Sequence, residues 1–271
     1  MTKNNVDIWH KMRFIAIPVL AIATHFLMSN ILYYAVENLF LNVLHIPEAQ
    51  FVKFAYLGEL LVYIALILIF FVAYKIIWKH EENEAGTEMN LRDSALSFMA
   101  GVGVTGISFL WIMLAEQVPA LQKSIDAMEA ANRNIAGGNV LGGILIAVIA
   151  APLIEEILFR GIVFRSIRRI GPAWVAILLS AILFGVYHMN VVQAVYATAM
   201  GAVAGIIYEK KKNLMFPVLV HIANNFIAAM EGFAPPEVGE MINVLSLVMI
   251  LPLGYIIYRL LRCERRDCRD Y

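Results

Sequence analysis

The segment Val140–Val163 reads VLGGILIAVIAAPLIEEILFRGIV, and it decides the class of fold because it is long, apolar and interrupted by only a few charges. A helix needs about 20 largely apolar residues to cross a hydrocarbon layer of roughly 30 Å. Each charged side chain at membrane depth costs about 2.5–3.5 kcal/mol on insertion scales. Glu155, Glu156 and Arg160 therefore need a structural or functional reason to be there.

The composition of the whole chain agrees with this segment. Apolar residues make up 61% of the 271 residues, charged residues make up 15%, and the mean hydropathy is +0.73. A soluble domain carries roughly half apolar and a quarter charged residues. The excess predicts that a lipid bilayer surrounds most of the protein. The net charge is zero, so no nucleic-acid partner and no bulk attraction to anionic lipid are expected.

Other segments share this length and hydropathy, and together they predict an all-α polytopic membrane protein of about eight transmembrane helices. The eight segments are Phe14–Val36, Phe51–Trp78, Ala95–Leu114, Val140–Val163, Ala173–Met189, Val191–Tyr208, Leu214–Met230 and Ile242–Leu261. Only Met189 and Asn190 separate the fifth segment from the sixth, which predicts a tight helical hairpin. The loop 115–138 contains a sequence typical of a short amphipathic helix from Gln122 onward.

The placement of lysine and arginine predicts the orientation, since cytoplasmic segments carry an excess of both. With the N-terminus inside, most basic residues fall on the cytoplasmic side and few on the outer side. The inner set is Lys3, Lys11, Arg13, Lys75, Lys79, Arg92, Arg165, Arg168, Arg169, Lys210, Lys211, Lys212, Arg259, Arg262, Arg265, Arg266 and Arg269. We therefore expect an integral membrane protein with both termini in the cytoplasm.

The polar residues of the fourth segment have a spacing that assigns them different roles. Residues four apart share a helix face, so Glu156 and Arg160 can form an ion pair. Glu155 is turned by about 100° from its neighbour and faces elsewhere. A carboxylate held in an apolar cavity is a typical general base.

Two further motifs in later segments contain histidine. Phe184 and His188 lie four residues apart, as do His221 and Asn225, so each pair shares one helix face. A ring beside an imidazole can fix its rotamer, and His221 with Asn225 offers two donors for a developing oxyanion. Three polar motifs in nearby helices predict one polar catalytic cavity in the later helices.

Helix ends alone do not bring these groups to one depth. At 1.5 Å per residue, Glu155 lies about 20 Å from Arg168 and His188 about 24 Å from Pro172. His221 lies only about 12 Å from Asn213 by the same measure. Tilt, an early start to the fifth helix or an embedded loop after Asn213 could each reconcile these depths.

The three motifs in this order resemble those of the CPBP family, which comprises CAAX prenyl endopeptidases and bacteriocin-processing (Abi) proteins. The resemblance covers about residues 140–230. It implies an intramembrane endopeptidase in which Glu155 and His188 activate a water, while Asn225 and His221 stabilise the oxyanion. Glu156 and Arg160 would then hold the helix of Glu155 in place, and no cofactor would be needed.

The resemblance also divides the chain. Residues 1–138 would hold the first three transmembrane helices and the outer loop. Residues 139–230 would form the catalytic core, helices four to seven. Residues 231–271 would form the last transmembrane helix and a basic cytoplasmic tail. The expected partner is a peptide or membrane-protein substrate, and the lack of an extra domain favours a bacterial cell membrane.

A zinc-dependent version of the same peptidase is the nearest alternative. Glu155, His188 and His221 could bind zinc with an open position for water, and Glu156 would then act as base. The chain contains no HExxH motif, which weighs against the metal.

Two alternatives belong to other classes of protein. A non-catalytic bacteriocin-immunity or membrane scaffold protein could retain the same fold, because fold does not determine function. A proton-coupled transporter could use Glu59, Glu155 and His25. Hydrogen bonds between helices are the simpler interpretation of Glu59 and His25.

Overall fold

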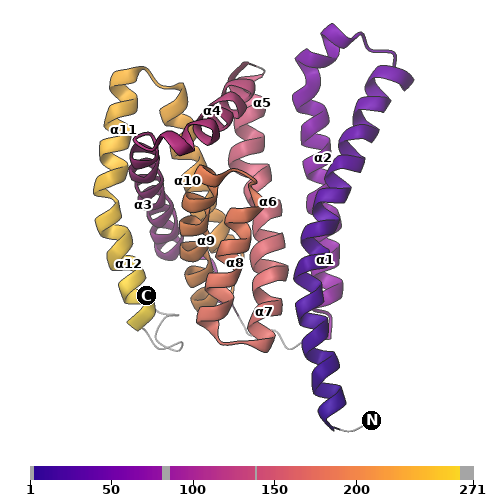
Figure 1. Ribbon diagram of the computed structural model, residues 1–271, viewed down its shortest axis with the longest axis vertical. Coiled ribbons are helices and arrows are strands. Elements are labelled where there is room, and N and C mark those ends of the chain that lie inside the picture. The colour runs from indigo at the N-terminus through magenta and orange to yellow at the C-terminus, as the bar shows by residue number, and fades with distance from the viewer. Residues whose placement is uncertain (1–2, 81–85, 138, 263–271) are drawn as a thin grey trace. The chain divides into compact units, whose positions relative to one another are not determined.

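The computed structural model describes residues 3–80, 86–137 and 139–262, and within these ranges the ordered elements are helices (Figure 1). Contacts divide the chain into two units, Met1–Glu82 with Asn134–Ala176 and Asn83–Arg133 with Ile177–Tyr271. Both units combine segments that are far apart in the sequence, and each is described by itself.

Helices long and apolar enough to cross a membrane confirm the all-α membrane class. The six candidates are Lys11–Val43, Phe54–Ile77, Leu91–Ala115, Val140–Ile170, Val191–Lys211 and Pro236–Arg262. The two other predicted segments also form helices, α8 (Ala173–Tyr187) and α10 (Met215–Phe233). Since α8 is shorter and α10 is not among the six candidates, the count of eight stays a prediction.

The first unit is built on a long antiparallel hairpin and one interrupted helix (Figure 1). Its elements are α1 (Lys3–Asn38), η1 (Leu39–Val43), α2 (Glu48–Ile77), α5 (Val140–Leu145), η3 (Ile146–Ala150), α6 (Ala151–Glu156), η4 (Ile157–Phe164) and α7 (Arg165–Ile170). Segments from α5 to α7 follow one another without a break and pack against α1 and α2. This helix carries the glutamate–arginine motif.

One end of the first unit gathers cations on aromatic rings. The guanidinium of Arg165 lies 4.3 Å from the ring of Trp78, and that of Arg169 lies 5.9 Å from it. Phe14 stacks on Trp78 at 6.0 Å, and Arg13 lies 5.2 Å from the Phe14 ring. Cations over tryptophan are held electrostatically, and such rings are common at a membrane surface. Basic residues assigned to one side from the sequence thus lie together.

The second unit is arranged around α3 (Leu91–Ala115), which packs against four other helices (Figure 1). Its remaining elements are η2 (Pro119–Leu121), α4 (Gln122–Gly137), most of α8, α9 (Val191–Lys211), α10, α11 (Pro236–Val248) and α12 (Ile250–Arg262). A Cβ on Gly101 would overlap the carbonyl oxygen of Val220, and a Cβ on Gly106 would overlap that of Ser246. Small residues therefore let α10 and α11 approach α3 closely.

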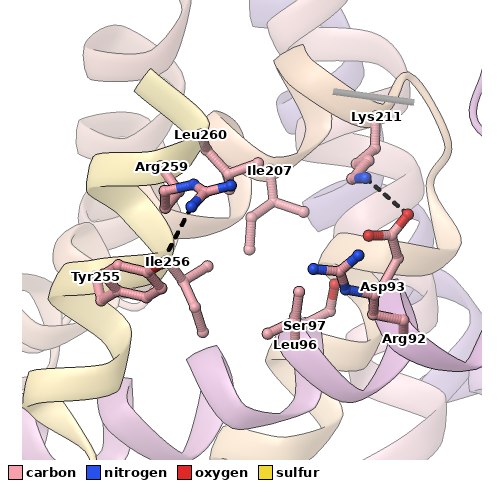
Figure 2. Close-up of a pocket in the computed structure, with 10 residues that line it drawn as sticks. All are labelled: Arg92, Asp93, Leu96, Ser97, Ile207, Lys211, Tyr255, Ile256, Arg259 and Leu260. Carbon is pink, nitrogen blue, oxygen red and sulfur yellow. Dashed lines mark hydrogen bonds and ion pairs between the residues drawn. The ribbon is translucent and has the colours of Figure 1, made fainter. Parts of the chain in front are cut away.

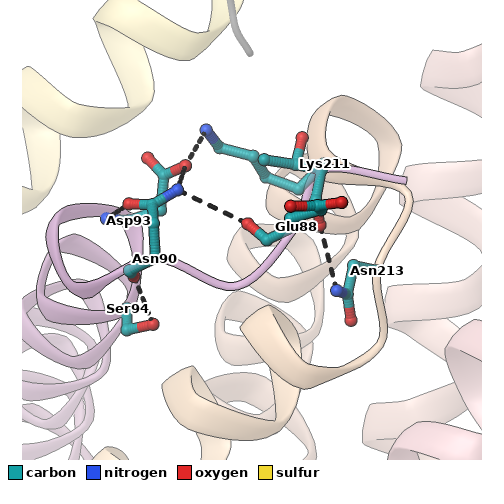
Figure 3. Close-up of polar contacts among 7 residues, drawn as sticks. Glu88, Asn90, Asp93, Ser94, Lys211 and Asn213 are labelled. Carbon is teal, nitrogen blue, oxygen red and sulfur yellow. Dashed lines mark hydrogen bonds and ion pairs between the residues drawn. The ribbon is translucent and has the colours of Figure 1, made fainter. Parts of the chain in front are cut away.

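A clamp of polar contacts holds the turn between α9 and α10 to the start of α3 (Figure 3). The N–H of Thr87 donates to the carbonyl of Lys211 at 2.8 Å, and the amide of Asn213 donates to the carbonyl of Thr87 at 3.0 Å. Lys211 also forms a buried ion pair with Asp93 at 2.7 Å. Asn90 caps α3 by accepting from the N–H of Asp93. The clamp lies directly before α10, which begins at Met215.

Helix α4 is the amphipathic helix predicted in the loop 115–138, and it is pinned to the turn between α8 and α9. The hydroxyl of Ser124 donates to Asn190 at 2.7 Å, and the amide of Asn190 donates to the Ser124 carbonyl at 2.8 Å. Trp111 of α3 donates to the carbonyl of Val192 at 2.9 Å. The predicted tight hairpin is confirmed, with Met189 in the left-handed region at φ 58°.

Candidate active site

The helix that carries the glutamates is widened on both sides of them. Pro152 has no N–H, so the regular hydrogen bond to a carbonyl four residues earlier is lost. The chain forms a π-helical stretch directly before this turn, η3, and another directly after Glu156, η4. Such wide turns are rare and often occur at functional sites. They change the direction in which the side chains around Glu155 point.

The predicted ion pair between Glu156 and Arg160 is confirmed. The two side chains are 2.8 Å apart and are 0% and 1% exposed. Arg160 also interacts electrostatically with Glu155, which is partly exposed. Glu155 is thus the more accessible of the two acids, as its position around the helix predicts.

Trp78 connects the glutamate helix to α2. Its indole N–H donates to the carbonyl of Gly161 at 2.8 Å, in a buried contact one residue after Arg160. The same ring lies under Arg165, which in turn donates to the hydroxyl of Tyr74 at 3.0 Å. The glutamate–arginine motif is therefore held by Trp78, a residue that lies outside the motif.

His188 lies at the end of α8, in the turn rather than inside the helix, because α8 ends at Tyr187. Its Nδ1 lies 2.8 Å from the carbonyl oxygen of Phe184. A carbonyl can only accept, so Nδ1 must carry the proton of this hydrogen bond. In the neutral imidazole, Nε2 is then the acceptor, which suits a group that takes a proton from water.

Phe184 is the common neighbour of both predicted histidines. Its ring centroid lies 4.8 Å from that of His188 and 5.6 Å from that of His221, both in edge-to-face geometry. Phe184 is 1% exposed and His221 is 4% exposed. The starts of α8 and α10 suggested that the two histidines lie at different depths. In the structure both imidazoles contact the same ring, that of Phe184. Helix α8 reaches this level at its end and α10 in its second turn.

Asn225 lies one turn after His221 and is oriented by a neighbour that the motif does not contain. Its Oδ1 accepts from the amide of Asn224 at 3.0 Å, so the role of donor falls to Nδ2. The hydroxyl of Thr105 in turn lies 3.3 Å from the carbonyl oxygen of Asn224. Because Gly101 lies one turn before Thr105, the small face of α3 is packed against this part of α10.

The supporting residues Trp78, Gly101, Thr105 and Asn224 were missed in the sequence. Only the spacing of Gly101 and Thr105, four apart on one apolar helix, could have indicated a close helix contact. Trp78 lies 83 positions before Gly161, and no local pattern connects the two.

The other membrane histidine and glutamate lie in the first unit, in aromatic surroundings. His25 is 6% exposed, and its ring centroid lies 5.4 Å from that of Phe70 on α2. Glu59 is hydrogen-bonded to Tyr33. Glu59 therefore agrees with the simpler interpretation of a hydrogen bond between helices, whereas His25 meets α2 through a ring contact.

The capacity to bind a metal depends on which donor atoms lie close together. Within the described residues, no group of three or more His, Cys, Asp or Glu side chains is close enough to hold an ion. The hydrogen bond from His188 Nδ1 to a carbonyl is nevertheless the arrangement that a metal-binding histidine commonly has. His188 would suit zinc as well as water through Nε2.

Comparison with known proteins agrees with the resemblance seen in the motifs. Residues 137–227 match the model of the Rce1-like family, described as "Type II CAAX prenyl endopeptidase Rce1-like". The matched segment is about a third of the chain and contains all six predicted site residues. No curated protein and no solved structure matches the chain. The suspected relation to CAAX proteases is thereby confirmed, and the match supports a CAAX-type intramembrane endopeptidase.

Proposed function

We propose that this protein is an intramembrane endopeptidase in which Glu155 and His188 activate the attacking water. The observation that carries the proposal is the arrangement of His188 and His221 on the Phe184 ring, within the segment that matches a peptidase family. The tautomer inferred for His188 supports a role as proton acceptor.

The proposed reaction moves one proton in each step. Glu155 takes a proton from the water while Nε2 of His188 accepts a hydrogen bond from it, and the water oxygen attacks the scissile carbonyl carbon. Nδ2 of Asn225 and the imidazole of His221 donate to the resulting oxyanion. The C–N bond then breaks, and Glu155 returns its proton to the leaving amine.

In this proposal Glu156 and Arg160 act on structure rather than on the substrate. Their ion pair is buried within one helix, so it keeps each charge neutralised without a partner from the substrate. The proposed effect is to fix the rotation of the helix and thereby the direction of Glu155.

Comparison of newly formed N-termini in membranes with wild-type protein and with Glu155→Gln tests the proposal without a known substrate. We expect a set of cleavage products that is present with wild type and lost with Glu155→Gln. Glu59→Gln is the matched control, because Glu59 is another membrane glutamate outside the motifs, and it should leave the set unchanged. An identical set with Glu155→Gln would instead favour a scaffold or immunity protein.

One observation favours the zinc alternative. The Nδ1 of His188 is hydrogen-bonded to a carbonyl, as is common for histidines that bind a metal. In that version Glu155, His188 and His221 would be the ligands, and zinc would supply an activated water. Metal analysis of the purified protein, with cleavage followed after chelation and after zinc is restored, distinguishes the two. Stoichiometric zinc that is required for turnover would replace the glutamate mechanism.

The substrate is proposed as a class. The family description names a CAAX prenyl endopeptidase, so a prenylated peptide C-terminus is one candidate. An unmodified peptide or membrane protein of a bacterial membrane is the other. Cleavage of one CAAX peptide with and without its prenyl group would separate them.

We also propose that both termini lie in the cytoplasm. Cys263 and Cys268, the only two cysteines, lie in the C-terminal tail and allow a direct test. A membrane-impermeant maleimide should label the protein only after the cells are permeabilised. Labelling in intact cells would place the C-terminus on the outer side and overturn the proposal.

A further inference from the structure

A pocket lies within the second unit, between α3, α9 and α12 (Figure 2). Its volume is about 170 Å³, well above the roughly 10–15 Å³ that a cavity needs to hold one water. The pocket lies where three candidate membrane spans begin or end: α3 begins at Leu91, α9 ends at Lys211 and α12 ends at Arg262. It therefore belongs at the level of a membrane surface.

Three of the charged residues that line the pocket are basic, and one, Asp93, is acidic. Asp93 and Lys211 form a buried ion pair with each other and largely cancel. The guanidinium groups of Arg92 on α3 and Arg259 on α12 extend from different helices toward the same space (Figure 2). Arg259 donates to the hydroxyl of Tyr255 at 3.1 Å, and a guanidinium has five N–H groups, so it can bind an anion as well. Two arginines facing one space favour a phosphate.

The rest of the lining is apolar, which indicates more than a free anion. Leu96, Ile207 and Ile256 line the pocket from all three helices, and both isoleucines are buried. Inorganic phosphate would contact the arginines and leave these side chains without a partner. A molecule with a phosphate at one end and a hydrocarbon chain at the other would match both parts.

We propose that this pocket binds one anionic phospholipid, with its phosphate between Arg92 and Arg259 and its acyl chain against Leu96, Ile207 and Ile256. Basic pockets between transmembrane helices are suited to anionic head groups, and each arginine near the surface adds roughly 1 kcal/mol of attraction. The bound lipid joins α3, α9 and α12. This function is separate from the proposed peptidase chemistry and does not depend on it.

The test uses the full-length protein in nanodiscs that contain zwitterionic phosphatidylcholine with a fifth of anionic phosphatidylglycerol. Native mass spectrometry after gentle extraction measures which lipid stays bound to the wild type and to Arg92→Gln/Arg259→Gln. We expect the wild type to retain phosphatidylglycerol in preference to phosphatidylcholine. The double variant should lower that preference by about thirtyfold, since it removes two arginines at roughly 1 kcal/mol each. Both arginines are exposed, so the variant should fold, which size-exclusion chromatography checks.

Arg262→Gln is the matched control. Arg262 lies on the same helix, stacks on Tyr258 at 4.8 Å as Arg259 stacks on Tyr255, and does not line the pocket. An unchanged preference in Arg262→Gln with a loss in the double variant supports the pocket. Equal losses in both, or no loss in the double variant, would overturn the proposal. It would also fail if inorganic phosphate at millimolar concentration displaced the retained phosphatidylglycerol, because the ligand would then be a free anion.

Discussion

The glutamate–arginine motif and the histidine pair are held in place by different means. Glu156 and Arg160 neutralise each other within one helix, at the spacing that any α-helix provides. His188 and His221 come from two helices and meet only because both pack on Phe184. The first arrangement is local, so it can be predicted from sequence. The second depends on where α8 and α10 lie relative to each other, which follows from contacts between helices rather than from spacing within one helix. Variants that break the Glu156–Arg160 pair should therefore lower stability, whereas variants that shift the packing of α8 and α10 should lower activity.

The largest effect is expected for variants of the two residues that the proposal assigns to water activation. Glu155→Gln and His188→Ala should each lower the cleavage rate by about 10²–10⁴-fold, the range of general acid–base catalysis. If both activate one water, the double variant should lose little more than the worse single variant. If the double variant instead lost the product of the two single fold-changes in cleavage rate, the two residues would act independently.

Next in size is the local ion pair. Arg160→Met leaves the Glu156 carboxylate buried beside an apolar side chain, so the free energy of unfolding should fall by about 3–5 kcal/mol. Thermal unfolding in detergent measures it. Glu156→Gln/Arg160→Met should be less destabilised than Arg160→Met alone, because it removes the uncompensated charge. A double variant as unstable as the single one would show that charge is not the cause.

The packing that positions α10 can be tested at a glycine. Gly101→Ala puts a methyl group against the carbonyl of Val220, so it should lower stability by about 1–3 kcal/mol and shift His221 and Asn225. The cleavage rate should fall by more than the loss of folded protein accounts for. Gly232→Ala in α10 meets no atom within 4 Å and is the control, with stability unchanged or slightly raised. Equal effects at the two glycines would contradict the close helix contact.

The smallest effect is expected at the hydrogen bond behind Asn225. Thr105→Val keeps the shape of the side chain but removes its hydroxyl from Asn224, which should cost about 0.5–1.5 kcal/mol of stability. A small fall in the catalytic rate with an unchanged KM would fit a role in orienting Asn225. Thr105→Ser should restore the rate, since it restores the hydroxyl. A rate that stays low in Thr105→Ser would point to packing instead.

Predictions that rest on residues close together in the sequence were confirmed more often than those that rest on residues far apart in it. Hydropathy predicted the helical segments, and i, i+4 spacing predicted the Glu156–Arg160 pair. The turn at Met189 followed from the short gap between two apolar segments. His188 was predicted within a helix, but it lies in the turn, because hydropathy continues through Met189 while the hydrogen bonds of α8 end at Tyr187. The π-helical turns around Pro152 were not predicted, since they depend on how the chain accommodates a missing N–H.

By itself, the sequence determined that this is an all-helical membrane protein with a glutamate–arginine pair on one helix. Hydrophobic length and helical periodicity are properties of the chain alone, and they need no partner from elsewhere. Only the tertiary structure decided that His188 and His221 share the Phe184 ring, that Trp78 holds Gly161, and that Arg92 and Arg259 face one pocket. These contacts join residues from different helices, so their geometry follows from how the helices pack and not from the spacing within any one of them.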